Sequence, residues 1–196
     1  DLGIDGFGSV LEAKIEAPAD NTKVGFSNGN GSFFWTKGDV IGVSSQNSFT
    51  PMTLAEECAG KQVGKFVGNA VLTNGYVLYP YNENHVLNGY EVEFNLPPSY
   101  TYTSLDAEYA SAEGNSHNAP MWGRIISNTV TFRHLGAVIA VMSTNLPAET
   151  DLILELTSGS KKLNGSFSAN FAEFEPKIST SASSIDSEKK VTINFK

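Results

Sequence analysis

Short runs of alternating apolar and polar residues dominate the chain, and Gly, Asn, Pro and Ser separate them. Such period-two alternation is typical of β-strands that bury one face. Residues 10–17 show it most clearly, with one charged residue between each pair of apolar ones. The apolar set is Leu11, Ala13, Ile15 and Ala17. We therefore predict a first strand here, with its other face in water.

The same alternation, or a short apolar run bounded by turn residues, predicts further strands along the chain. They cover residues 32–36, 40–44, 63–68, 90–96, 129–142, 152–156, 163–174 and 191–195. Asn74-Gly75 lies between two apolar runs and predicts a hairpin over residues 71–79, because Asn-Gly favours the tight turn. The long run 129–142 is rich in β-branched residues, so we expect a central strand in which Gly136 offers a bend.

Two short segments are candidates for helices. Thr53 and Glu56 have the spacing of a capping box, and Gly60 can end a helix of about two turns. Residues 104–114 form a second candidate, for which a loop excursion is an equal alternative. With about ten strands at short spacing and no long helical crossover, the chain fits an all-β sandwich or barrel. We expect one domain over residues 1–196.

Composition and charge exclude several partners. The chain has 196 residues, 17% of them charged, with a net charge of −8 and a pI near 4.8. A domain this acidic repels phosphate backbones and anionic bilayers, so we expect no nucleic acid as a partner. No apolar run approaches the roughly 18 residues of a membrane span. The chain begins at Asp1, without Met or an export signal, and is expected to be a mature or trimmed form.

No residue pattern predicts catalysis, a metal site or a cofactor. His85, His117 and His134 lack metal-ligand spacing, and a surface or hydrogen-bonded role is the simpler interpretation. Cys58 is the only cysteine, so it forms no intrachain disulfide, and the neighbouring Glu57 disfavours a reactive thiolate. Serine-nucleophile, phosphate-loop and calcium-loop motifs are also absent from the sequence.

Aromatic residues give the only other lead to a binding function. The tyrosines crowd into one third of the chain, at positions Tyr76, Tyr79, Tyr81, Tyr90, Tyr100, Tyr102 and Tyr109. Exposed rings of this kind could stack on sugars, which makes a surface glycan-binding β-sandwich module the alternative function. The simpler interpretation is that the rings fill a core and its ends.

Several local strings, in order, resemble the fimbrillin (FimA/Mfa-like) family of Bacteroidales fimbrial subunits. They are Phe34-Trp35-Thr36-Lys37-Gly38-Asp39-Val40-Ile41-Gly42-Val43, Lys65-Phe66-Val67-Gly68, Tyr76-Val77-Leu78-Tyr79-Pro80-Tyr81, Val92-Glu93-Phe94-Asn95-Leu96-Pro97, Pro120-Met121-Trp122-Gly123, and residues 130–139. Together they span residues 34 to about 167, or two thirds of the chain. The match is to the N-terminal domain of such proteins.

The resemblance implies a transthyretin-like Greek-key sandwich and a non-enzymatic role in a pilus or in cell adhesion. It also implies export as a lipoprotein to the outer membrane, with other fimbrial subunits, or a host or bacterial surface protein or glycan, as partners. Family members usually carry a second β-domain, which is expected to be absent or removed here. Because Trp35 and Trp122 lie in family-like strings beside turns, we predict that both are buried.

Pilus subunits of this family polymerise by strand exchange, in which a strand from the next subunit fills the groove left by an N-terminal strand. The resemblance thus makes the first strand, with Leu11, Ala13, Ile15 and Ala17, a displaceable strand. The end of the chain has donor form, with apolar residues Val191, Ile193 and Phe195.

Processing in the family is often Arg-specific, but Arg124 and Arg133 are the only arginines and lie within the predicted fold. Lys14 or Lys23 would have to serve instead. We predict an uncleaved monomer with a docked first strand, competent to assemble after a cut near Lys23 or not at all. The equal alternative is that both end strands are permanent members of their sheets.

Overall fold

The computed structural model of the protein describes residues 8–16, 34–102, 120–136, 152–179 and 183–195. Within these ranges strands form nearly all of the regular structure, and the helices are single turns, η1 (Glu56–Cys58) and η3 (Asp186–Lys189). The all-β prediction is confirmed. The strands are β1 (Ser9–Ile15), β2 (Val40–Ser45), β3 (Ser48–Leu54), β4 (Val63–Gly68), β5 (Tyr76–Tyr79), β6 (Val86–Asn88), β7 (Glu91–Leu96), β8 (Ser99–Tyr102), β9 (Met121–Ile126), β10 (Thr129–His134), β11 (Leu152–Thr157), β12 (Gly165–Asn170), β13 (Ile178–Ser179) and β14 (Lys190–Phe195).

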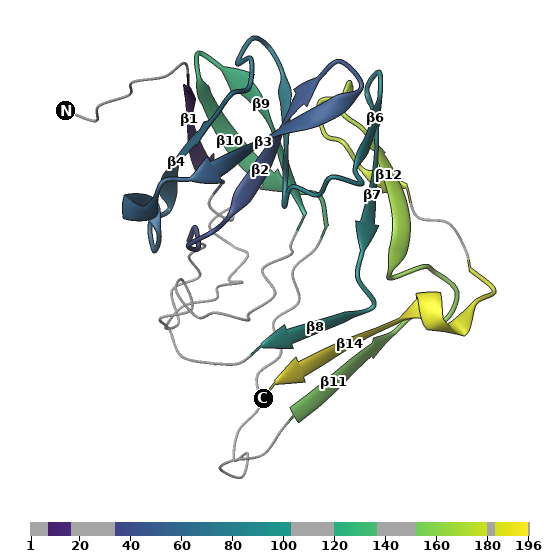
Figure 1. The fold of residues 1–196 in the computed structure, drawn as a ribbon. Coiled ribbons are helices and arrows are strands. Elements are labelled where there is room, and N and C mark those ends of the chain that lie inside the picture. Colours follow the sequence, from purple (N-terminus) through teal and green to yellow (C-terminus); the bar gives the residue numbers. More distant parts are fainter. Residues whose placement is uncertain (1–7, 17–33, 103–119, 137–151, 180–182, 196) are drawn as a thin grey trace.

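Seven of these strands close into a barrel in the order β1-β10-β9-β5-β2-β3-β4 (Figure 1). All neighbours are antiparallel except β1 and β10, which run parallel. Alternate side chains of each strand point inward and form one core. Trp35 enters this core from the segment before β2 and meets the rings of Phe66, Tyr79 and Phe132 edge-on, at centroid distances of 4.9 to 5.6 Å.

A second layer covers one wall of the barrel. It is a four-stranded sheet in the order β13-β12-β7-β6. Leu78 of β5 and Trp122 of β9 point outward from the barrel and pack in a second core, with Phe94 and Phe167 from the sheet. Two layers thus share a continuous apolar interface, which is the arrangement that makes a sandwich.

The third sheet has the order β11-β14-β8, and its centre is the last strand of the chain. Asn164, which is buried, ties this sheet to the segment before β12, because its Nδ2 donates to the carbonyls of Ser187 and Lys190 at 2.7 Å each. The Lys162–Glu188 ion pair, at 3.2 Å, lies beside this connection. The strand pattern left a sandwich or a barrel open, and the resemblance implied the sandwich. Seven strands do close into a barrel, and the packing of layers is compatible with the expected sandwich.

The helix predicted from Thr53 to Gly60 is wrong in extent. Thr53 and Leu54 belong to β3, where they pair with Val67 and Phe66 of β4, and the helical part is the single turn Glu56–Cys58. No side chain caps that turn. Strand pairing within the barrel satisfies the backbone of Thr53 and Leu54, so tertiary contacts override the local capping signal.

The hairpin predicted over residues 71–79 is also wrong. Asn74 does adopt a positive φ of 49°, as its turn signal indicated. However, the strand that follows, β5, pairs with β2 and β9, whereas residues 71–73 form no strand and Val71 is 69% exposed. The turn at Asn74 therefore leads the chain into β5 of the barrel and does not pair β5 with residues 71–73.

Other strand predictions differ mainly in their ends. The strand predicted over 129–142 ends at His134, before Gly136, and residues 137–142 lie outside the described ranges. Residues 34–36 are not a strand, and the helix candidate at 104–114 lies outside the described ranges. Strands β3, β6, β8, β9 and β13 were not predicted.

Candidate functional site

The first strand is fully integrated in the barrel. Leu11 and Ala13 are 0% exposed and Ile15 is buried, all three in the barrel core. The strand pairs with β4 over six positions, from Ser9 to Lys14, and with β10 from Glu12 to Ile15. Ala17, the fourth residue of the predicted displaceable set, lies outside the described residues. Removal of β1 would therefore open the barrel between β4 and β10 and leave three emptied apolar positions.

The last strand is likewise paired on both sides. It is antiparallel to β11, from Leu152 opposite Phe195 to Thr157 opposite Lys190, and parallel to β8. Val191 is buried and Ile193 is half-buried. The two predicted exchange strands thus lie in different sheets, at opposite ends of the view in Figure 1, and the structure does not bring them together.

The candidate processing sites differ in what the structure shows of them. Lys14 lies within β1, opposite Val63 of β4 and Thr131 of β10, with its side chain exposed. Proteases bind extended chain segments, so a cut at Lys14 requires β1 to detach from both neighbours first. Lys23 lies outside the described residues.

The histidines and Cys58 show no catalytic arrangement in the described ranges. His85 lies near the rings of Phe49 and Phe94, and burial lowers its pKa to about 4. Burial also lowers the pKa of His134. Cys58 is buried, and its Sγ accepts a hydrogen bond from the Lys65 N–H at 3.4 Å. Among the described residues, no three His, Cys, Asp or Glu side chains gather as metal ligands would.

A polar network near the barrel core fixes the turn between Trp35 and β2. The Tyr79 hydroxyl donates to Asp39 Oδ1 at 2.9 Å, and Asp39 Oδ2 accepts from the Thr36 N–H at 2.7 Å. Burial raises the pKa of Tyr79 well above its ordinary value, and the nearby Asp39 carboxylate adds to this effect. The phenol stays protonated and acts as a donor to the turn, which is a structural role.

Both tryptophans are buried, as predicted: Trp35 is 1% exposed and Trp122 is 5% exposed. They therefore offer no flat face to a sugar. The tyrosines do not form one platform either, since Tyr79 is buried in the barrel core while Tyr90 is 56% exposed. Tyr76 is half-buried and lies next to Tyr90, with ring centroids 5.9 Å apart.

Two residues beside these tyrosines were missed by the sequence reasoning. Arg124 of β9 lies over the Tyr76 ring at 5.3 Å, and its Nη2 donates to the carbonyls of Phe171, Ala172 and Glu173 at 3.0 to 3.2 Å. Phe174, at the end of that turn, is 79% exposed. These contacts join segments nearly fifty residues apart, so no local sequence pattern predicts them. The only hint in the sequence was that the chain has just two arginines.

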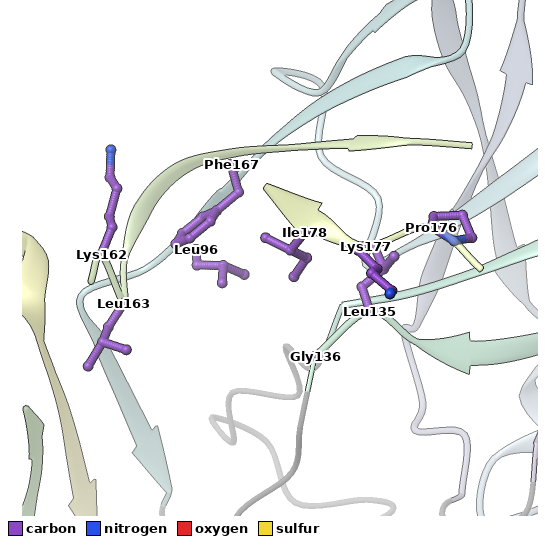
Figure 2. A pocket seen from close by; sticks show the side chains of 9 residues that line it. All are labelled: Leu96, Leu135, Gly136, Lys162, Leu163, Phe167, Pro176, Lys177 and Ile178. Atoms are coloured by element: carbon purple, nitrogen blue, oxygen red, sulfur yellow. The ribbon is translucent and has the colours of Figure 1, made fainter. Parts of the chain in front are cut away.

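An apolar groove of about 460 Å³ lies at the end of the four-stranded sheet. Figure 2 shows Leu96, Phe167 and Ile178 around the same space, with Lys162 and Lys177 at its two ends. Lys162 is paired with Glu188. The lining carries no acid–base pair, so it offers an apolar surface without the groups that general acid–base catalysis needs.

Comparison of the chain with protein-family models, curated proteins and solved structures found no match. In the ranges that the structure describes, none of the helices has the length and apolar character needed to cross a bilayer.

Proposed function

We propose that the protein is a non-enzymatic fimbrial or adhesion subunit at the surface of a Bacteroidales bacterium, and that it assembles by β-strand exchange. The proposal rests on the resemblance to fimbrillins and includes that family's transthyretin-like Greek-key topology, export as a lipoprotein and outer-membrane location. The observation that carries it is the position of β1 between β4 and β10, with Leu11, Ala13 and Ile15 buried.

This position would make β1 a replaceable strand. Its loss would leave unpaired backbone groups along β4 and β10 and empty the positions of Leu11, Ala13 and Ile15. An exposed pair of strand edges with apolar pockets at alternate positions is what a donor strand recognises. Main-chain hydrogen bonds would supply affinity, and side chains at every second position would fill the pockets.

The last strand has the required alternation, with Val191, Ile193 and Phe195. It also carries two requirements of its own. First, β14 must leave β11 and β8 before it can act as a donor strand. Second, if residues 191, 193 and 195 take the places of residues 11, 13 and 15, Ile193 must fit the space of the smaller Ala13. Overpacking of this kind costs about 1–3 kcal/mol, so β14 should bind more weakly than β1 itself.

The test is a cut after Lys23, followed by removal of residues 1–23 in denaturant, refolding and size analysis. The control is a peptide of residues 8–16, which should re-enter the opened barrel and restore the monomer. The proposal expects a peptide of residues 190–196 to enter as well, more weakly, and the peptide-free core to form concentration-dependent oligomers. A core that regains its fold with peptide 8–16, yet neither takes up peptide 190–196 nor oligomerises, would refute strand exchange for this chain.

The alternative function, surface glycan binding, depends on where the aromatic side chains reach the surface, and it can be tested independently of strand exchange.

A further inference from the structure

One rim of the interface between the barrel and the four-stranded sheet carries a continuous strip of aromatic and arginine side chains. It runs from Tyr90 to Tyr76, at 5.9 Å, and from Tyr76 to Arg124, at 5.3 Å. Arg124 donates hydrogen bonds to the carbonyls of residues 171–173, and Phe174 is the next residue along the chain. Arg133 of β10 lies over the Phe174 ring at 5.9 Å. Residues from three strands, β5, β9 and β10, and from two turns thus meet in a single surface feature, which we call the aromatic strip.

The two ends of the aromatic strip are not core residues. Tyr90 is 56% exposed and Phe174 is 79% exposed. Tyr76, between them, is half-buried and rests at 5.8 Å on Phe171, which is 0% exposed. Tyr76, and Tyr90 through it, are therefore supported by a buried ring, while Phe174 lies against Arg133. Large exposed apolar groups that gather in one place mark interaction surfaces more often than scattered single ones do.

The arginines on the aromatic strip are held in place. Three backbone carbonyls bind Arg124 Nη2, and Glu16 Oε2 pairs with Arg133 Nε at 3.0 Å. The chain has only these two arginines, and each lies over an aromatic ring. The guanidinium has five N–H donors, whereas among the described residues Arg124 bonds through Nη2 and Arg133 through Nε, so each has further N–H groups to offer a ligand. The rings are thus flanked by fixed hydrogen-bond donors.

Charge decides which ligand class fits. Glu16 pairs with Arg133, and the exposed residues Glu173 and Glu175 flank Phe174 in the sequence. The chain as a whole carries a net charge of −8. This surface does not favour phosphate, anionic lipid or acidic sugars. It does suit a neutral ligand with many hydroxyl groups, since guanidinium groups donate to hydroxyl oxygens and carboxylates accept from hydroxyl hydrogens.

We infer that the aromatic strip binds a neutral glycan, with sugar rings lying against Tyr90 and Phe174 and their hydroxyl groups bonded to Arg124 and Arg133. Aromatic faces accept the apolar C–H face of a sugar, while the flanking polar groups fix its orientation. The site does not involve β1 or β14. Glycan binding is therefore a function beyond strand exchange, and each of the two proposals can be refuted without the other.

The test is binding of the intact protein to an array of neutral and acidic oligosaccharides, followed by titration calorimetry with the best neutral one. Tyr90→Ala and Phe174→Ala should each weaken binding by about tenfold or more, because each removes a ring that the sugar would cover. Tyr90→Phe keeps the ring and should retain binding. Ile153→Ala, which truncates a side chain 62% exposed on β11, away from the strip, is the matched control and should change nothing.

Denaturant unfolding of each variant separates binding from folding. Because Tyr90 and Phe174 are exposed, their replacement should leave the denaturant midpoint of unfolding nearly unchanged. The inference is overturned if the protein binds no neutral glycan, if it binds acidic glycans alone, or if both alanine variants bind as the wild type does. It is also overturned if Phe174→Ala abolishes self-association measured by sedimentation, since the strip would then be a contact between copies. None of these outcomes depends on peptide uptake by the opened barrel.

Discussion

At the scale of single residues, Trp35 joins three other aromatic rings in the barrel core. Its indole is 1% exposed, meets three rings edge-on, and donates from Nε1 to the Ala13 carbonyl of β1 at 3.3 Å. We predict that Trp35→Ala lowers the free energy of unfolding by about 3–5 kcal/mol, the usual loss for a buried aromatic residue. Urea unfolding followed by circular dichroism measures this. Trp35→Phe, which retains a ring, should lose clearly less, and a loss below about 1 kcal/mol for the alanine variant would contradict the packing described.

His85 makes stability depend on pH. Burial between Phe49 and Phe94 lowers its pKa from 6.5 to about 4, so the unfolded chain binds a proton more readily than the folded protein does between these values. Stability should therefore fall as the pH drops from 6.5 to 4, by about 1–2 kcal/mol once its partial exposure is allowed for. His85→Gln removes this titration, and the measurement is the difference in unfolding free energy between wild type and variant at pH 7 and pH 4. Equal pH slopes for the two proteins would show that His85 does not contribute.

The surroundings of a single residue could be predicted where they depend on its neighbours in sequence, and not where they depend on distant segments. Trp35 and Trp122 were expected to be buried because both lie beside turns, in strings that resemble the fimbrillin family, and both are buried. The partners of Arg124 could not be foreseen, since its carbonyl acceptors at residues 171–173 reach it only through the packing of β12 against the barrel. That Cys58 is no nucleophile stays a prediction, and the structure shows that its side chain is buried.

Among the elements, the alternating strands β1, β4 and β7 were found from the sequence, and β9 was not. Strands β1, β4 and β7 alternate buried and exposed residues, and their predicted ranges agree within about two residues. Strand β9 is different, because Met121 and Ile125 face the barrel core while Trp122 faces the second core. With both faces apolar its alternation disappears, so the pattern cannot reveal it.

Strand β9 also contains a tight backbone approach. A Cβ at Gly123 would lie 2.7 Å from the Thr131 carbonyl oxygen of β10 and against the Val130 side chain. We predict that Gly123→Ala lowers the free energy of unfolding by about 1–3 kcal/mol, because backbone atoms cannot move aside as a flexible side chain can. Gly159→Ala is the control, since a Cβ there has no atom within 4 Å. Denaturant midpoints that are the same for the two variants would refute the crowding at Gly123.

For the whole molecule, closure of the barrel was beyond what the sequence could indicate. It depends on the parallel pairing of β1 with β10, in which Glu12 lies opposite Thr129. Parallel neighbours are joined by no tight turn, so no short-range signal marks them. The last strand shows the same limit: its alternation was evident, but its position at the centre of the third sheet follows from pairing with β8 and β11.

The two cores predict how the molecule unfolds. Trp35 lies in the barrel core and Trp122 in the core between the barrel and the four-stranded sheet, and the chain has no other tryptophan. Leu78 and Trp122 point into the second core from β5 and β9, and Val77, Tyr79, Met121 and Ile125 of the same two strands line the first. Loss of either core therefore exposes the wall that both share. We therefore predict one cooperative transition, as expected for a single domain.

Two single-tryptophan proteins test this prediction. Trp122→Phe leaves Trp35 to report on the barrel, and Trp35→Phe leaves Trp122 to report on the interface between the layers. Both variants are destabilised, so each fluorescence transition is compared with the far-ultraviolet circular dichroism transition of the same variant, not with the other protein. If the molecule is one unit, the two signals coincide in each variant, and their urea dependence gives the same m value. A fluorescence change of Trp122 that precedes the loss of circular dichroism would show that the four-stranded sheet separates from an intact barrel, and the chain would then hold two units.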